Sequence, residues 1–114
     1  MIKFTILLKR NPQMTQEAFV SYHKSNHAQL FMSIQVVKKT VRRYIQQHAL
    51  EVEFPGLPPP KYDGITELWF DSVEALGECF SDPEYLAKAR PDEAKFLDLD
   101  ACDFVVSTEN PVKA

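Results

Sequence analysis

Hydrophobic residues first gather near the start of the chain, from Ile2 to Leu8, in a run broken only by Lys3. The run is rich in β-branched and aromatic residues, which favour strands. A continuous apolar run of this length predicts a central strand that is buried on both faces. Asn11 and Pro12 then end the strand as a turn.

From Thr15 onward the spacing becomes that of a helix. Thr15 as the capping residue and Glu17 in the first turn mark its start. Its inner face is set by three- and four-residue spacing and carries Phe19, Tyr22, His23, Asn26, Leu30 and Ile34. We therefore expect an amphipathic helix with an unusually polar inner face.

Two more strands flank a proline-rich segment. Residues 40–48 are strand-like, and alternation puts Tyr44 and His48 on one face. Residues 64–70 form the next strand. Between the two strands, residues 49–62 cannot continue a ladder because proline lacks an N–H. We expect a surface loop there that is long enough to serve as a lid.

A second helical region follows. Residues 71–74 cap its first helix, and Asp82 with Pro83 at the first helical position starts another helix. We expect that helix to run to Pro91, with residues 92–99 adding another turn.

A last strand at residues 104–107 completes the order β-α-β-β-α-β, the ferredoxin-like α+β arrangement. It places the helices on one face of a four-stranded antiparallel sheet, within a single domain of residues 1–114. The other face then remains uncovered and should be an apolar patch. A second copy of the chain is the simplest cover, which predicts a homodimer.

Composition narrows the classes of function. The net charge is −3, with basic and acidic residues scattered along the chain, which argues against a nucleic-acid partner. No apolar run could span a membrane and no signal peptide is visible, so we expect a cytoplasmic protein. Cys79 and Cys102 lack CxxC spacing and are expected to be buried hydrophobes. Three glycines form no phosphate-binding loop.

Several short motifs occur in an order that resembles the EthD family. They are Lys9-Arg10, Phe19-x-x-Tyr22-x-x-x-x-His27, Arg43-Tyr44-x-Gln46-x-His48, Tyr62-Asp63-Gly64-Ile65-x-Glu67-Leu68-Trp69-Phe70, Asp82-Pro83-Glu84 and Asp92-Glu93-x-x-Phe96-x-Asp98. The resemblance implies a sheet-to-sheet dimer, with a pocket between each sheet and its own helices. The family includes cofactor-free decarboxylases and dehydratases of aromatic polyketides, and isomerases of small lactones. His23 departs from the family pattern, which commonly has an aromatic residue such as tryptophan there.

His27 is the first candidate for a general acid or base, because it lies on the inner side of the helix. The alternative is a helix-end histidine that bonds a nearby carbonyl. His48 is the second candidate catalytic residue, with Tyr44 beside it, although His48 could simply end its strand at the solvent. The expected substrate-binding residues are Tyr22, His23, Phe31, Tyr44, Asp63 and Trp69.

Three of these residues carry alternatives. His23 and His27 have the spacing of two metal ligands on a helix, but no third ligand is evident, so we expect no metal. Asp63 could fix the tautomer of a histidine or simply make a turn with Gly64. Trp69 could contact substrate or belong to the core, and its sheet face is not fixed by the pattern.

Together with these residues, the resemblance to the EthD family implies an enzyme that needs no cofactor and acts on a small hydrophobic or aromatic, polyketide-like molecule. A lyase that decarboxylates or dehydrates its substrate by histidine acid–base catalysis is the first hypothesis. An isomerase or cyclase would use the same groups. The rival classes are a small-molecule binding or accessory protein and a dimer that only makes protein interactions.

Overall fold

Four strands pair in one antiparallel sheet. β1 (Ile2–Leu8) lies between β3 (Gly64–Phe70) and β4 (Asp103–Ser107), and β2 (Val41–His48) pairs with the other edge of β3, which gives the order β2-β3-β1-β4. This is a computed structural model, and it describes residues 1–113. The expected ferredoxin-like α+β arrangement is confirmed.

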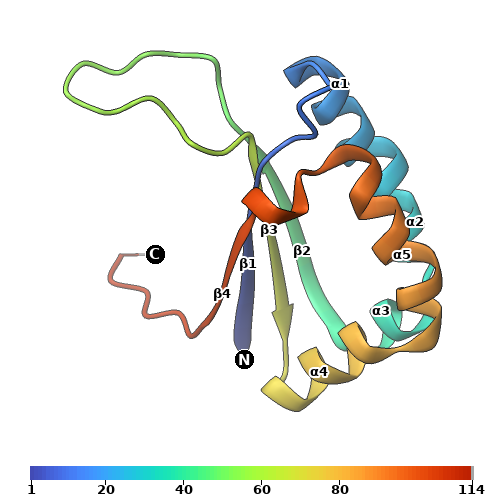
Figure 1. Ribbon diagram of the computed structural model, residues 1–114. Helices are drawn as coiled ribbons and strands as arrows, with labels where there is room; N and C mark the ends of the chain where they lie inside the picture. The colour runs from blue at the N-terminus through green and yellow to red at the C-terminus, as the bar shows by residue number, and fades with distance from the viewer. Residues whose placement is uncertain (114) are drawn as a thin grey trace.

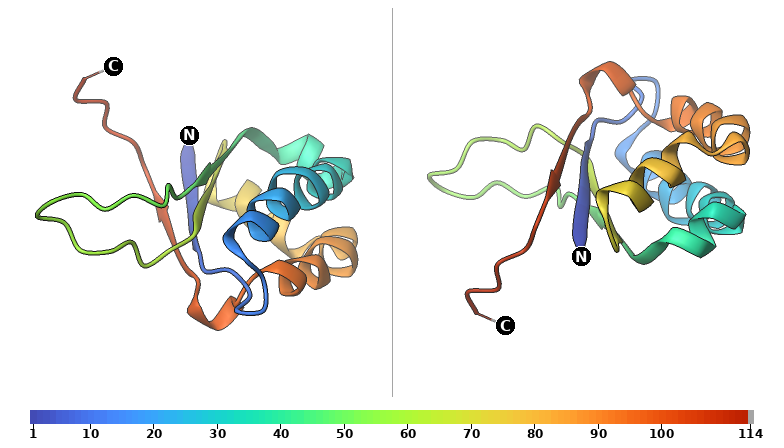
Figure 2. Two further views of the ribbon diagram at one scale, coloured as in Figure 1. Left: turned by 90° about the horizontal axis from the view of Figure 1, so that it is seen from above. Right: turned by 90° about the horizontal axis from the view of Figure 1, so that it is seen from below.

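The helices lie on one side of the sheet (Figures 1 and 2). Between β1 and β2 the chain forms α1 (Gln16–Ser21), the π-helix η1 (Tyr22–His27), α2 (Ala28–Ser33) and α3 (Gln35–Thr40). Between β3 and β4 it forms α4 (Val73–Ser81), α5 (Pro83–Phe96) and the short 3-10 turn η2 (Leu99–Ala101). The expected caps are present, because the side chains of Thr15, Ser72 and Asp82 each accept a backbone N–H of the following turn.

Pro91 does not end its helix, contrary to expectation. Helix α5 continues without a break from Pro83 to Phe96. Proline has no N–H, so the carbonyl of Ala87 loses its intrahelical donor. Both Ala87 and Pro91 are exposed to solvent, where water can satisfy that carbonyl.

The hydrophobic core lies between the sheet and the helices in two clusters. One cluster of buried side chains centres on Phe31, Ile34, Val37, Leu68, Phe70, Tyr85 and Ala89. A second cluster consists of Leu8, Phe19, Phe96 and Leu97. Strand β1 is central, as expected, but most of its side chains are only partly buried, because the far side of the sheet has no helical layer.

That far side, called here the open face, is not the apolar patch that we expected. Lys3 forms an ion pair with Glu67, and the Lys3 ammonium and the Arg43 guanidinium lie 5.2 and 4.8 Å from the centre of the Trp69 ring. The Trp69 indole N–H donates to Glu109, which follows β4. Glu67 and Trp69 are therefore buried although no helix covers them. The open face combines paired charges with apolar side chains, because the ladder places Leu7, Ile65 and Ile45 on the same side as Glu67 and Trp69.

The loop between β2 and β3 extends away from the helices. Together with the residues after β4 it reaches beyond the open face (Figures 1 and 2). Gly56 in this loop has a φ of 84°, a left-handed conformation that suits glycine. The loop is a surface loop, as expected, and it does not cover the helix side of the sheet. Among residues 1–113, no helix is both long and apolar enough to cross a membrane.

Candidate functional site

A π-helical turn directs two histidines toward the sheet. The buried residues of α1, η1 and α2 are Phe19, His23, His27 and Phe31, each four positions after the last. Side chains four positions apart drift around an α-helix, because one turn takes 3.6 residues. The wider turn of η1, closed by the Ala28 N–H donating to the His23 carbonyl, counteracts this drift. Such π turns often occur at functional sites.

A cavity of about 540 Å³ lies between the sheet and the helices. Its wall is mostly apolar and includes Phe4, Ile6 and Leu8 of β1, Phe104 and Val106 of β4, Leu76 and Phe80 of α4, and Phe96 and Leu97. Five polar side chains join this wall, namely His23, His27, Tyr85, Arg90 and Glu93. An apolar cavity of this size with a few polar groups is typical of small-molecule sites.

His27 is held by a buried carboxylate. Its Nδ1 lies 2.8 Å from Oδ2 of Asp92, and the Tyr22 hydroxyl donates to the other carboxylate oxygen over 2.5 Å. Burial, with the hydrogen bond to Asp92, raises the pKa of Tyr22 to about 12, so the hydroxyl keeps its proton. A histidine that donates from Nδ1 has its lone pair on Nε2. Nε2 of His27 has no hydrogen-bond partner within residues 1–113.

Glu93 and Tyr85 form a second polar pair on the cavity wall. The Tyr85 hydroxyl donates to Oε1 of Glu93 over 2.5 Å, and Nε of Arg90 lies 3.5 Å from Oε2. Burial raises the pKa of Glu93, and this outweighs the opposing effects of Tyr85 and Arg90. The pKa of Tyr85 is also raised, first by burial and then by the charge of Glu93. The site thus places a carboxyl group with a raised pKa on the same cavity as His27.

His23 connects His48 to the interior. Its Nδ1 lies 3.0 Å from Nε2 of His48, and its Nε2 lies 3.1 Å from the Thr66 hydroxyl. Burial, with smaller effects from His48 and His27, lowers the pKa of His23 to about 3, so the ring stays neutral. Partial burial, followed by the charge of Lys24, also lowers the pKa of His48.

The structure places the expected site residues in different parts of the molecule. His27 and His23 line the large cavity, while Tyr22, Phe31 and Tyr44 lie close to these histidines. His48, the second candidate catalytic residue, is not on the cavity wall, because its ring points at His23. Asp63 and Trp69 lie elsewhere.

Trp69 is on the open face, on the opposite side of the sheet from the helices. In the antiparallel ladder it pairs with Lys3 of β1 and Arg43 of β2, and its ring packs against both side chains. Its neighbour Leu68 points to the helix side, because successive side chains of a strand alternate. Trp69 therefore does not line the cavity under the helices, and its expected part in substrate binding is not supported by that cavity.

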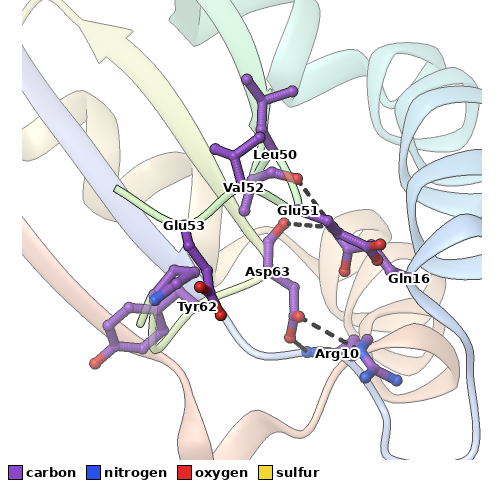
Figure 3. A pocket seen from close by; sticks show the side chains of 10 residues that line it. Arg10, Gln16, Leu50, Glu51, Val52, Glu53, Tyr62 and Asp63 are labelled. Atoms are coloured by element: carbon purple, nitrogen blue, oxygen red, sulfur yellow. Dashed lines mark hydrogen bonds and ion pairs between the residues drawn. The ribbon is translucent and has the colours of Figure 1, made fainter. Parts of the chain in front are cut away.

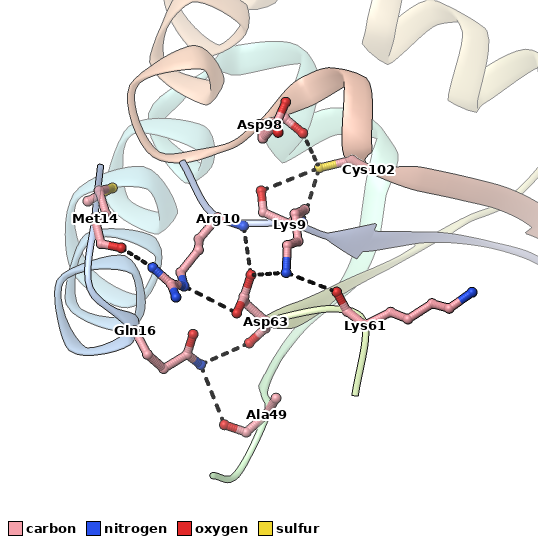
Figure 4. Close-up of polar contacts among 9 residues, drawn as sticks. All are labelled: Lys9, Arg10, Met14, Gln16, Ala49, Lys61, Asp63, Asp98 and Cys102. Atoms are coloured by element: carbon pink, nitrogen blue, oxygen red, sulfur yellow. Dashed lines mark hydrogen bonds and ion pairs between the residues drawn. The ribbon is translucent and has the colours of Figure 1, made fainter. Parts of the chain in front are cut away.

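Asp63 lies at the base of the long loop and binds Arg10 and Lys9 there, so it does not orient a histidine. Its carboxylate accepts the backbone N–H of Arg10 over 2.9 Å and pairs with the side chains of Arg10 and Lys9 (Figure 4). The Gln16 amide donates to the carbonyl oxygens of Asp63 and Ala49 (Figures 3 and 4). This cluster forms part of a separate surface pocket of about 350 Å³.

Three residues of the site, Tyr85, Asp92 and Glu93, were not among the candidates predicted from the sequence. A signal was available for Asp92, because the buried residues of α5 are Tyr85, Ala89, Asp92 and Phe96, which follow helical periodicity. An acidic residue at a core position of such a pattern requires a buried partner. His27 is that partner. Within residues 1–113, no three His, Cys, Asp or Glu side chains are grouped so that they could hold a metal ion.

Comparison with known proteins places the chain in a family. A model of the EthD domain matches residues 11–100. The fold resembles that of an EthD family protein from Bacillus halodurans, with 22% identity over 96% of this chain and 100% of that one and a TM-score of 0.71.

Two further solved structures share the fold. A protein from Arabidopsis thaliana is 19% identical, with all of both chains covered and a TM-score of 0.68. A dimeric protein with a ferredoxin-like fold from Bacteroides fragilis is 14% identical over 95% of each chain, with a TM-score of 0.61. None of the curated protein sequences matches the chain. Because the EthD model spans most of the sequence, the chain belongs to the EthD family.

Proposed function

We propose that this protein is a lyase, a decarboxylase or dehydratase that needs no cofactor and acts on a small aromatic or polyketide-like molecule. The observation that carries the proposal is the setting of His27. Asp92 fixes its Nδ1 at 2.8 Å, its Nε2 has no hydrogen-bond partner within residues 1–113, and its ring lines a mostly apolar cavity of about 540 Å³. A base oriented by a buried carboxylate is a recurrent arrangement for proton transfer.

In a dehydration, His27 takes the proton from the carbon next to a carbonyl group of the substrate. The electron pair of that C–H bond forms a double bond, and the C–O bond of the neighbouring hydroxyl breaks. Glu93 gives the departing hydroxyl a proton so that it leaves as water, and the proton on His27 restores Glu93. The raised pKa of Glu93 supports its role as the acid.

In a decarboxylation, the bond between the carboxylate and its carbon breaks and carbon dioxide leaves. The electron pair stays on the carbon, which then takes a proton from protonated His27. His27 takes up one proton from solvent in each turnover, which balances the reaction. An apolar wall disfavours the carboxylate relative to neutral carbon dioxide, and the wall here is built mainly of Phe, Leu, Ile and Val side chains. Among residues 1–113, Arg90 is the only lysine or arginine in that wall, and its positive charge can pair with an acidic substrate.

His27 and Glu93 also suit an isomerase or a cyclase, because both reactions move a proton to and from an activated carbon. A third possibility is a binding or accessory protein in which the cavity holds its ligand without proton transfer. The products separate these cases. A lyase releases carbon dioxide or water, an isomerase leaves the mass unchanged, and a binding protein leaves the compound unchanged.

The test uses a panel of hydroxylated aromatic acids and aryl β-hydroxyketones, with product masses measured by mass spectrometry. Replacing His27 by glutamine should reduce kcat by about 100-fold or more while the compounds still bind, because proton transfer contributes about 10²–10⁴-fold. Asp63→Asn is the control, since Asp63 lies outside the cavity. Turnover that is unchanged in His27→Gln would refute the proposal, and binding without turnover in the parent protein would indicate the accessory role.

We also infer that two copies of this chain form a homodimer through their open faces. The dimeric Bacteroides fragilis protein shares the fold, and the open face here offers charged and apolar side chains beside the projecting loop (Figure 2). That loop exposes several large hydrophobic side chains, namely Leu50, Val52, Phe54 and Leu57. Light scattering at micromolar concentration should give twice the chain mass of 13.1 kDa. A monomer mass would contradict the inference.

A further inference from the structure

A second and much smaller cavity lies beside the large one. Its volume is about 30 Å³, and its wall is formed by Ile6, His27, Phe31, Tyr44, Thr66, Leu68, Phe80 and Glu93. His27 and Glu93 belong to the walls of both cavities. A single water molecule needs roughly 10–15 Å³ of such space and two to four polar partners. The inner cavity meets both conditions, with four polar side chains in its wall.

The Tyr44 side chain, in the wall of the inner cavity, has a hydroxyl hydrogen without an acceptor among residues 1–113. Its oxygen accepts a hydrogen bond from Nε2 of Gln46 over 2.7 Å, and the same Gln46 nitrogen donates to the His23 carbonyl over 2.8 Å. Burial raises the pKa of Tyr44 to about 12, so the hydroxyl keeps its hydrogen. No group within residues 1–113 accepts that hydrogen. Leaving a buried donor unsatisfied costs about 1–3 kcal/mol, which favours an acceptor in the cavity.

Thr66 connects the inner cavity to the surface. Its hydroxyl lies 3.1 Å from Nε2 of His23, and the other nitrogen of His23 lies 3.0 Å from His48. His48 is only partly buried and lies at the end of β2. The Thr66 hydroxyl can donate to one neighbour while it accepts from another. It therefore can bond His23 and a molecule in the cavity at the same time.

We propose that the inner cavity binds one water molecule, which joins the two histidine clusters into a single hydrogen-bonded chain. The chain runs from His48 through His23 and Thr66 to the water, and from the water to His27 and Glu93. The proposal rests on the protein without a substrate and does not depend on the reaction proposed above.

The hydrogen-bond roles along this chain are consistent. Neutral His23 has one N–H and one lone pair, so it donates on one side and accepts on the other. The water accepts the hydrogen of Tyr44, bonds the Thr66 hydroxyl, and donates to Glu93 or to Nε2 of His27. Either tautomer of His23 completes the chain. A proton can therefore pass in either direction between the cavity and the solvent, including when a ligand fills the large cavity.

Crystallography tests the water directly. A crystal structure of the protein, at a resolution that shows ordered water, should contain one water within hydrogen-bond distance of the Tyr44 and Thr66 hydroxyls. The double variant Tyr44→Phe, Thr66→Val keeps nearly the same volume and should lose that water, because its two hydroxyl partners are gone. An inner cavity without density in the parent protein, or with the same density in the variant, would overturn the proposal.

Nuclear magnetic resonance of protein labelled with ¹⁵N-histidine tests the continuity of the chain without any substrate. As pH is lowered and His48 takes up a proton, the ring nitrogen signals of His27 should shift in step with those of His48. Thr66→Val should remove that coupled shift by interrupting the chain. Thr5→Val is the matched control, because Thr5 pairs with Glu67 and so lies on the open face.

The two variants give a clear decision. Loss of the coupled shift in Thr66→Val with its retention in Thr5→Val supports the chain. A coupled shift that persists in Thr66→Val, or that is absent from the parent protein, refutes it. The side chains of Lys24 near His48, and of Asp92 and Glu93 near His27, are unchanged in both variants. Neither refuting result would affect the proposed enzyme, whose test is the turnover of His27→Gln.

Discussion

Acidification from neutral pH to about pH 4.5 should destabilise the fold through His23. The pKa of this imidazole is 6.5 when it is unperturbed and about 3 in the folded protein. Between these values the unfolded chain binds a proton that the folded protein does not, so stability is present above pH 6.5 and falls as the pH drops below it. His23 is 1% exposed, and solvent therefore screens little of this effect.

The size of the loss follows from the interval between the two pKa values. Each pKa unit corresponds to about 1.36 kcal/mol. Acidification to about two pH units below the unperturbed pKa should therefore lower the free energy of unfolding by about 2.7 kcal/mol. Other groups titrate in the same range, with the lowered pKa of His48 adding to the loss and the raised pKa of Glu93 opposing it. A comparison between variants is needed to isolate His23.

His23→Gln supplies that comparison. The glutamine amide can still donate and accept hydrogen bonds toward His48 and Thr66, but it does not titrate. Urea unfolding of both proteins at pH 7 and at about pH 4.5 should each give one transition if residues 1–114 form a single domain. Between the two pH values, the free energy of unfolding should fall by about 2.7 kcal/mol more in the parent protein than in the variant. Equal losses in the two proteins would refute the assignment of a neutral, buried His23.

Two further predictions concern local structure. Gly64→Ala should lower the free energy of unfolding by about 1–3 kcal/mol, because a Cβ there would lie 2.9 Å from the Gln47 carbonyl oxygen. The control is Gly77→Ala in α4, where an added Cβ has no atom within 4 Å. In the same urea assay this control should stabilise the helix by up to about 1 kcal/mol. Asp82→Ala should cost about 1 kcal/mol by removing the cap of α5, and a thermal midpoint equal to that of the parent protein would contradict this.

The order of strands and helices could be predicted from local patterns, because each element carries its own signals. The strand Gly64–Phe70 matches its expected bounds, and the capping side chains of Thr15, Ser72 and Asp82 bond as expected. Pro91 was misjudged because the rule that proline ends a helix depends on burial. Here the carbonyl that loses its donor faces water.

The candidate site was only partly predictable. Helical spacing places His23 and His27 on the inner side of their helix, which the structure confirms. The spacing shows which side of the helix a residue lies on, but it does not identify the residue that it contacts. It therefore could not pair His27 with Asp92, which lies 65 positions later in the chain. It also could not show that the His48 ring stops at His23 instead of reaching the cavity.

The sequence by itself therefore determined the succession of elements and the inner faces of the helices, because propensity, capping and periodicity act over a few residues. Only the tertiary structure decided which side chains meet. The register of β1, β2 and β3 placed Trp69 between Lys3 and Arg43 on the open face, and the packing of α5 against η1 brought Asp92 to His27. Both outcomes depend on contacts between segments far apart in the chain, where no local pattern specifies the partner.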